Sequence, residues 1–154
     1  MTTKKVDFKT LFAATESIWY NELGSVMKIT EIDSNLGTFR GTYCTAVGEA
    51  EKEYLLLGRF DTAGQTLGWV VSWQNQYQNP HIYSTTSWSG QAQYDPTISD
   101  YVILTNWLLT VETSPENDWN STNVGHDTFR RLQPNLRAKH TLSLIHISEP
   151  TRPY

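Results

Sequence analysis

The chain has 154 residues, of which 20 are Thr and 12 are Ser, and its six Trp, eight Tyr and five Phe are too many aromatics for a disordered protein. Its formal net charge is −4, and the lack of any basic cluster argues against a nucleic-acid partner. A single cysteine, Cys44, excludes an internal disulfide and a cysteine-based zinc site, and no apolar run is long enough to span a membrane.

The first 16 residues are predicted to be a tail. Asp7, Lys9 and Glu16 interrupt any hydrophobic region of a signal peptide, so no signal peptide is predicted in this sequence. The localisation of the protein is therefore not predicted. One helical turn is the alternative for this segment, because apolar residues recur at short intervals: Val6, Phe8, Leu11 and Phe12.

From residue 17 onward, short runs rich in Thr, Trp, Tyr and Val alternate with turn residues, a pattern typical of β-strands. Eight strands are predicted at 17–20, 25–31, 36–43, 53–60, 67–74, 83–93, 101–111 and 120–130. No stretch of helical period separates them, which argues against parallel crossover units. The prediction is therefore an all-β domain over 17–132, an eight-stranded antiparallel up-and-down barrel, with a two-sheet sandwich as the alternative.

The segment 133–154 shows neither strand alternation nor a helical period. It is predicted to be a non-native or disordered C-terminal tail. Residues 142–154 look like a translated sequencing adapter, and they are therefore excluded from the fold prediction.

Side chains alternate between the two faces of a strand, and one predicted face mixes large aromatics with single hydroxyls. An ordinary core would be aliphatic there, because buried hydroxyls need partners. Aromatic walls with a few placed polar groups are typical of a small-molecule pocket. The residues on this face are Tyr43, Thr45, Trp69, Val71, Trp73, Ser84, Thr86, Trp88, Thr105, Trp107 and Leu109.

Several short segments, in one order and with nearly constant spacing, resemble the avidin/streptavidin family. They are 19–25 (WYNELGS), 41–43 (GTY), 46–48 (AVG), 67–69 (LGW), 88–91 (WSGQ), 105–109 (TNWLL) and 124–129 (VGHDTF). The resemblance runs from about residue 17 to residue 132 and is stronger to streptavidin-like members. It implies a barrel that binds biotin with high affinity in its open end, without catalysis or a cofactor. It also implies a homo-oligomer, with a tetramer favoured over a dimer.

The resemblance assigns roles around the ureido ring of biotin. Asn21, Ser25 and Tyr43 would donate hydrogen bonds to the ureido oxygen. Asp127 and Thr45 would accept hydrogen bonds from the two ureido N–H groups.

The rest of the ligand is assigned in the same way. Thr86 would face the thioether sulfur, and Ser84 would contact the valeryl carboxylate. Trp119 would cover the pocket of a neighbouring subunit. The walls would be Trp73, Trp88 and Trp107, with Leu109 beside them.

Two positions depart from the family pattern. Glu49 stands where streptavidin-like members have an amide near the ligand carboxylate, and Ile82 with Tyr83 resembles an insertion before Ser84. An exposed carboxylate at 49 would repel the ligand carboxylate by about 1 kcal/mol and cannot donate a hydrogen bond. Glu49→Asn is therefore expected to slow dissociation of free biotin more than that of amide-linked biotin. An unchanged off-rate for free biotin would contradict this expectation.

The sequence gives weaker support to other functions. His126 and Asp127 are neighbours on a predicted strand and therefore point to opposite faces, which argues against a hydrolase triad, and the scattered His residues do not predict a metal site. The alternative function is a carbohydrate-binding β-module, which needs Trp69, Trp73 and Trp88 exposed as stacking platforms. A lipocalin-like carrier would leave a buried Asp127 without a partner.

Overall fold

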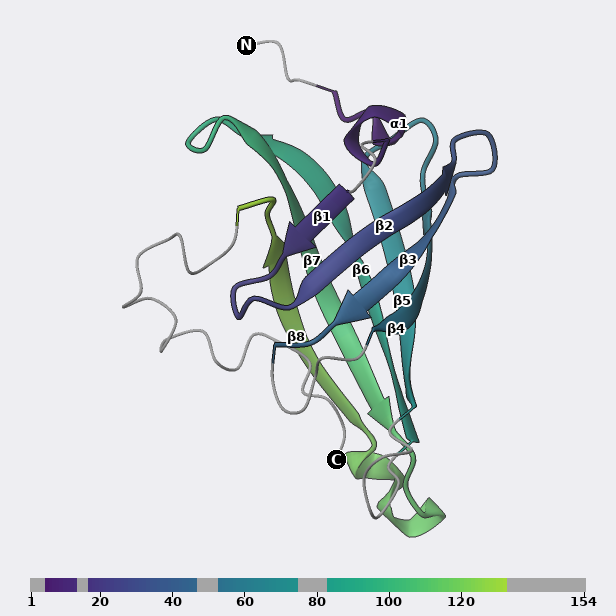
Figure 1. Cartoon of the computed structure of the whole chain (residues 1–154). Coiled ribbons are helices and arrows are strands. Elements are labelled where there is room, and N and C mark those ends of the chain that lie inside the picture. The colour runs from purple at the N-terminus through teal and green to yellow at the C-terminus, as the bar shows by residue number, and fades with distance from the viewer. Residues whose placement is uncertain (1–4, 14–16, 47–52, 75–82, 133–154) are drawn as a thin grey trace.

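The computed structural model describes residues 5–13, 17–46, 53–74 and 83–132, and its eight strands form one antiparallel sheet in sequence order (Figure 1). The strands are β1 (Ser17–Tyr20), β2 (Val26–Asp33), β3 (Thr38–Cys44), β4 (Tyr54–Phe60), β5 (Thr66–Gln74), β6 (Tyr83–Asp95), β7 (Asp100–Val111) and β8 (Thr122–Phe129). Two short helices accompany them, α1 (Phe8–Leu11) and the 3-10 helix η1 (Pro115–Asn120). The predicted all-β fold is confirmed, and each strand begins and ends within two residues of its prediction.

The sheet curls until its first and last strands meet, which closes it into a barrel. In the part of the chain that the structure describes, closure rests on one backbone bridge, in which the Tyr20 and Arg130 amides donate to each other's carbonyls at 2.7 and 2.9 Å. Each of the other pairings is a longer ladder between strands that follow one another in the chain. We call the short contact between β1 and β8 the seam.

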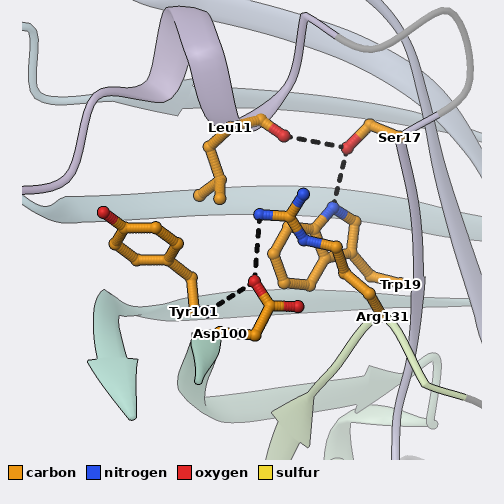
Figure 2. Close-up of polar contacts among 6 residues, drawn as sticks. All are labelled: Leu11, Ser17, Trp19, Asp100, Tyr101 and Arg131. Atoms are coloured by element: carbon orange, nitrogen blue, oxygen red, sulfur yellow. Dashed lines mark hydrogen bonds and ion pairs between the residues drawn. The ribbon is translucent and has the colours of Figure 1, made fainter. Parts of the chain in front are cut away.

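A polar network braces the seam beside α1 (Figure 2). The Trp19 indole N–H donates to Ser17 Oγ at 2.8 Å, and this hydroxyl donates to the Leu11 carbonyl at 3.4 Å. The Arg131 guanidinium lies 4.8 Å from the Trp19 ring centroid and pairs with Asp100 at 3.4 Å. The network therefore connects the α1 segment, β1 and the residues that follow β8.

The described part of the predicted N-terminal tail packs against the barrel, so the loose-tail expectation does not hold for residues 5–13. Asp7 begins α1 and accepts a hydrogen bond from the Lys9 amide at 3.1 Å. Phe8 lies 4.8 Å from the ring of Phe60, and Phe12 lies 5.3 Å from the ring of Phe39. The apolar residues of this segment are buried because they share one face of the helical turn.

The barrel has two different ends. The turns β2–β3 and β4–β5 lie at the end that α1 covers, and η1 lies at the opposite end, which we call the η1 end (Figure 1). Because the strands run up and down, the β1–β2 turn also lies at the η1 end. Neither helix of the described chain is long and apolar enough to cross a membrane. The predicted C-terminal tail, 133–154, lies outside the described residues.

Candidate functional site

Eleven of the predicted site residues lie on the inner face of the barrel, and none is more than 9 % exposed. They are Asn21, Ser25, Tyr43, Thr45, Trp73, Ser84, Thr86, Trp88, Trp107, Leu109 and Asp127. Trp119 differs, because it is 82 % exposed on η1. Glu49 and Ile82 lie outside the described residues, whereas Tyr83 begins β6 with an exposed side chain and leaves Ser84 facing inward.

The turn between β1 and β2 fixes the Asn21 side chain. Its Oδ1 accepts hydrogen bonds from the amides of Leu23 at 3.1 Å and Ser25 at 2.9 Å. Gly24 turns the chain with a φ of 91°, a conformation that glycine adopts without strain. With Oδ1 accepting from two amides, Nδ2 is the group of this side chain that remains as a donor. It is buried and has no partner among the described residues.

Ser25 joins the first turn to the end of β3. Its hydroxyl oxygen accepts a hydrogen bond from the Ala46 amide at 3.0 Å. Thr45 precedes Ala46 and is 4 % exposed, so the side chains of Ser25 and Thr45 are both buried where β2 begins and β3 ends. Because the Ser25 oxygen is an acceptor for Ala46, its hydrogen remains available for donation.

Trp73 and Thr86 form a second pair. The Trp73 indole N–H donates to Thr86 Oγ1 at 2.7 Å, so the Thr86 hydroxyl hydrogen points elsewhere. The Trp73 ring packs edge-on against Tyr43 at 5.7 Å and against Tyr54 at 5.0 Å. These contacts hold the indole in one orientation beside the hydroxyl.

The Trp88 indole and the Asp127 carboxylate form a buried hydrogen bond, 2.9 Å between Nε1 and Oδ2. Asp127 is 1 % exposed, and Thr105 Oγ1 donates to its backbone carbonyl at 3.0 Å. A buried carboxylate is costly unless hydrogen bonds compensate for lost water. Trp88 therefore both stabilises the carboxylate and fixes the direction in which it faces.

The remaining wall comes from β7. Trp107 pairs across strands with Trp88 on one side and with Gly125 on the other. A Cβ atom at Gly125 would collide with the Trp107 indole, so glycine is what lets this ring lie flat against β8. Leu109 follows on the same face, opposite Thr86.

Trp69 Nε1 on the inner face and Arg130 Nε are buried donors without a partner in the described chain. Among the predicted site residues the same holds for two donors, Asn21 Nδ2 and Ser84 Oγ. An unsatisfied buried polar group costs about 1–3 kcal/mol. A ligand that presents oxygen acceptors to both atoms would recover this free energy. The inner face therefore suits a small molecule with a polar head and an apolar body, enclosed by indole rings.

Two residues that support the site were not predicted. Tyr54 is buried against Trp73, and only its alternation with Leu56 could have indicated this. Glu22 accepts a hydrogen bond from the Thr128 amide at 2.7 Å, a contact between residues 106 apart in the chain. No local pattern signals that contact.

Three features of the structure bear on the other candidate functions, which are a carbohydrate-binding module, a hydrolase triad and a metal site. Trp69, Trp73 and Trp88 are at most 2 % exposed, so the stacking platforms of a carbohydrate-binding module are absent from these three positions. His126 is exposed and Asp127 buried, as expected for neighbours on a strand. Within the described ranges, no group of three or more His, Cys, Asp and Glu side chains could hold a metal ion.

Comparison with known proteins agrees with this geometry. A model of the avidin family matches residues 10–132. Avidin-related protein 4/5 of Gallus gallus is 37 % identical over 120 residues, covering 74 % of this chain and 75 % of that protein. Avidin of Gallus gallus is 36 % identical over 123 residues, covering 75 % of this chain and 76 % of avidin.

Proposed function

This chain belongs to the avidin family, and on that premise we propose that it binds biotin with high affinity inside the barrel, at the η1 end, without catalysing a reaction. The observation that carries the proposal is the buried Asn21 amide. The amides of Leu23 and Ser25 donate to its oxygen, and its nitrogen is a buried donor without a partner among the described residues. A ureido oxygen is the kind of acceptor that this nitrogen requires.

The other polar groups complete a ureido site. Ser25 and Tyr43 donate to the same oxygen as Asn21, while Asp127 and Thr45 accept from the ring N–H groups. Fixed donors of this kind lower the cost of ordering the site when the ligand binds. The bond from Trp88 supports the role of Asp127, because it orients the carboxylate before any ligand arrives.

The apolar part of biotin lies among the indoles in this proposal. Trp73, Trp88 and Trp107 enclose the bicyclic ring and the start of the chain, with Leu109 beside them. Thr86 accepts from Trp73 and directs its own hydrogen to the thioether sulfur, a weak acceptor. Ser84 Oγ, buried and without a described partner, bonds the valeryl carboxylate.

A biotin titration tests the proposal. Calorimetry should show one biotin per chain, and the fluorescence of the buried Trp residues should change with biotin and not with sugars. Thermal unfolding of the same sample should shift upward at saturating biotin, because the ligand binds only the folded state. The absence of both binding heat and stabilisation would overturn the proposed function.

Assembly into a homo-oligomer, with a tetramer favoured over a dimer, is part of the proposal. Apolar side chains are exposed as cross-strand neighbours on two parts of the outer face, Leu57 with Val70 and Leu108 with Val124. Exposed apolar patches of this kind mark protein interfaces. Trp119, 82 % exposed at the η1 end, would then cover the site of a neighbouring subunit.

Trp119→Ala is expected to raise the biotin dissociation rate by about tenfold or more, because one indole wall of each site is lost. Size-exclusion chromatography with light scattering, run beside the off-rate measurement, checks the role of the subunit contact. Glu116→Ala, also exposed on η1, is the matched control. A monomeric wild-type protein, or an unchanged off-rate in Trp119→Ala, would contradict the proposed lid.

A further inference from the structure

Glu22 makes the longest-range side-chain contact at the η1 end of the seam. It lies in the turn that follows β1, and its Oε1 accepts a hydrogen bond from the Thr128 amide of β8 at 2.7 Å. The carboxylate is half-buried, and its Oε2 is shielded from solvent with no partner among the described residues. Hydrogen bonds to an ionised acceptor are shorter and stronger than those between neutral groups.

The position of this bond follows from the register of the seam. Tyr20 pairs with Arg130, so the next antiparallel step would place residue 22 opposite residue 128. The chain cannot continue the ladder there, because β1 ends at Tyr20 and the chain turns. The Glu22 carboxylate accepts the bond that a backbone carbonyl would otherwise accept, and so extends the seam by one step.

The two residues joined by this bond each follow a residue of the proposed site. Asn21 precedes Glu22, and Asp127 precedes Thr128. The Tyr20–Arg130 bridge joins β1 to the residue that follows β8, and the Glu22 bond lies between this bridge and the η1 end. Glu22 and Thr128 are the direct chain neighbours of Asn21 and Asp127, so their bond links the two backbones beside the Asn21 amide and the Asp127 carboxylate.

We propose that Glu22 is a positioning residue for ligand binding, which sets the distance across the seam between Asn21 and Asp127. The proposal rests on the proposed function, because it requires Asn21 and Asp127 to bind the same ureido group. A ureido oxygen and its N–H groups have fixed geometry, so donor and acceptor on two strands must be held at a matching separation. Glu22 acts through Asn21 and Asp127 and does not touch the ligand itself.

Glu22→Ala, Glu22→Gln and the exposed control Glu31→Ala separate positioning from general stability. Two quantities are measured in each: hydrogen exchange of the Thr128 amide without ligand, and the biotin dissociation rate. Glu22→Ala should raise both by at least about tenfold, the size of a lost bond to a charged acceptor. Glu22→Gln keeps an Oε1 acceptor and gives up no other described bond, so both quantities should stay within about threefold of wild type.

A double-mutant cycle with Asp127→Ala completes the test. If Glu22 acts through Asp127, Glu22→Ala should change biotin affinity by less than about threefold in the Asp127→Ala background. Faster exchange of the Thr128 amide in Glu22→Ala with an unchanged biotin off-rate would overturn the positioning role while leaving the proposed function intact. Additive effects of Glu22→Ala and Asp127→Ala would overturn it as well. A wild-type protein that binds no biotin would overturn both proposals, and the titration described above detects that case separately.

Discussion

Asp127→Ala is expected to weaken biotin binding by about a hundredfold. The substitution removes an acceptor for the ligand, and loss of a hydrogen bond to a buried charged group costs about 1.5–3 kcal/mol. It also leaves the Trp88 indole N–H without the partner that it has at 2.9 Å. Calorimetry or a competition assay measures the affinity, and thermal unfolding without ligand shows how much of the change is loss of stability.

Two control variants sharpen this result. Asp127→Asn retains an oxygen that can accept from Trp88, so the folded protein should keep most of its stability while biotin binding still weakens. His126→Ala changes the neighbouring side chain on the outer face and should leave affinity unchanged. If Asp127→Ala bound biotin as tightly as the wild type, the assigned role of the carboxylate would be wrong.

The second large effect is expected at the other end of the barrel, from Phe12→Ala. Phe12 is 3 % exposed, with ring centroids 6.2 Å from Trp19 and 5.3 Å from Phe39. Truncating a buried phenylalanine costs about 3–5 kcal/mol, because packing is lost and a cavity remains. For a domain of this size we expect the melting temperature to fall by about 10 °C.

Biotin binding provides the contrast for this prediction. Phe12 packs beside α1, away from the proposed site, so the biotin off-rate of Phe12→Ala at 25 °C should change little. Lys9→Ala on the exposed side of α1 is the matched variant and should leave the melting temperature within about 2 °C. A melting temperature for Phe12→Ala equal to that of the wild type would mean that the N-terminal segment does not support the barrel.

Strand positions were predictable because turn residues and β-branched runs alternate along the chain in local patterns. Parity then placed the aromatic and hydroxyl side chains on one face, and Trp73, Thr86 and Trp88 are indeed buried together. Both properties depend on neighbours in sequence, so one sequence suffices to find them.

The packing of the N-terminal segment needed more than a local pattern. A four-residue helix is too short to be stable alone, so its formation depends on the surface that receives it. Phe39 and Phe60 supply part of that surface from distant strands. The same holds for Glu22, whose partner Thr128 becomes its neighbour only when the barrel closes.

The seam also governs the order in which the barrel can fold. Every ladder joins strands that follow one another in the chain, so each can form as a hairpin, whereas Glu22 and Thr128 must meet across 106 residues. Closing a loop of this length costs about 2 kcal/mol more in chain entropy than closing one of about ten residues. We therefore expect the seam to form last and to open first. A ligand bound by Asn21 on one side of the seam and by Asp127 on the other would oppose this opening. It would therefore slow unfolding of the chain more than it accelerates folding.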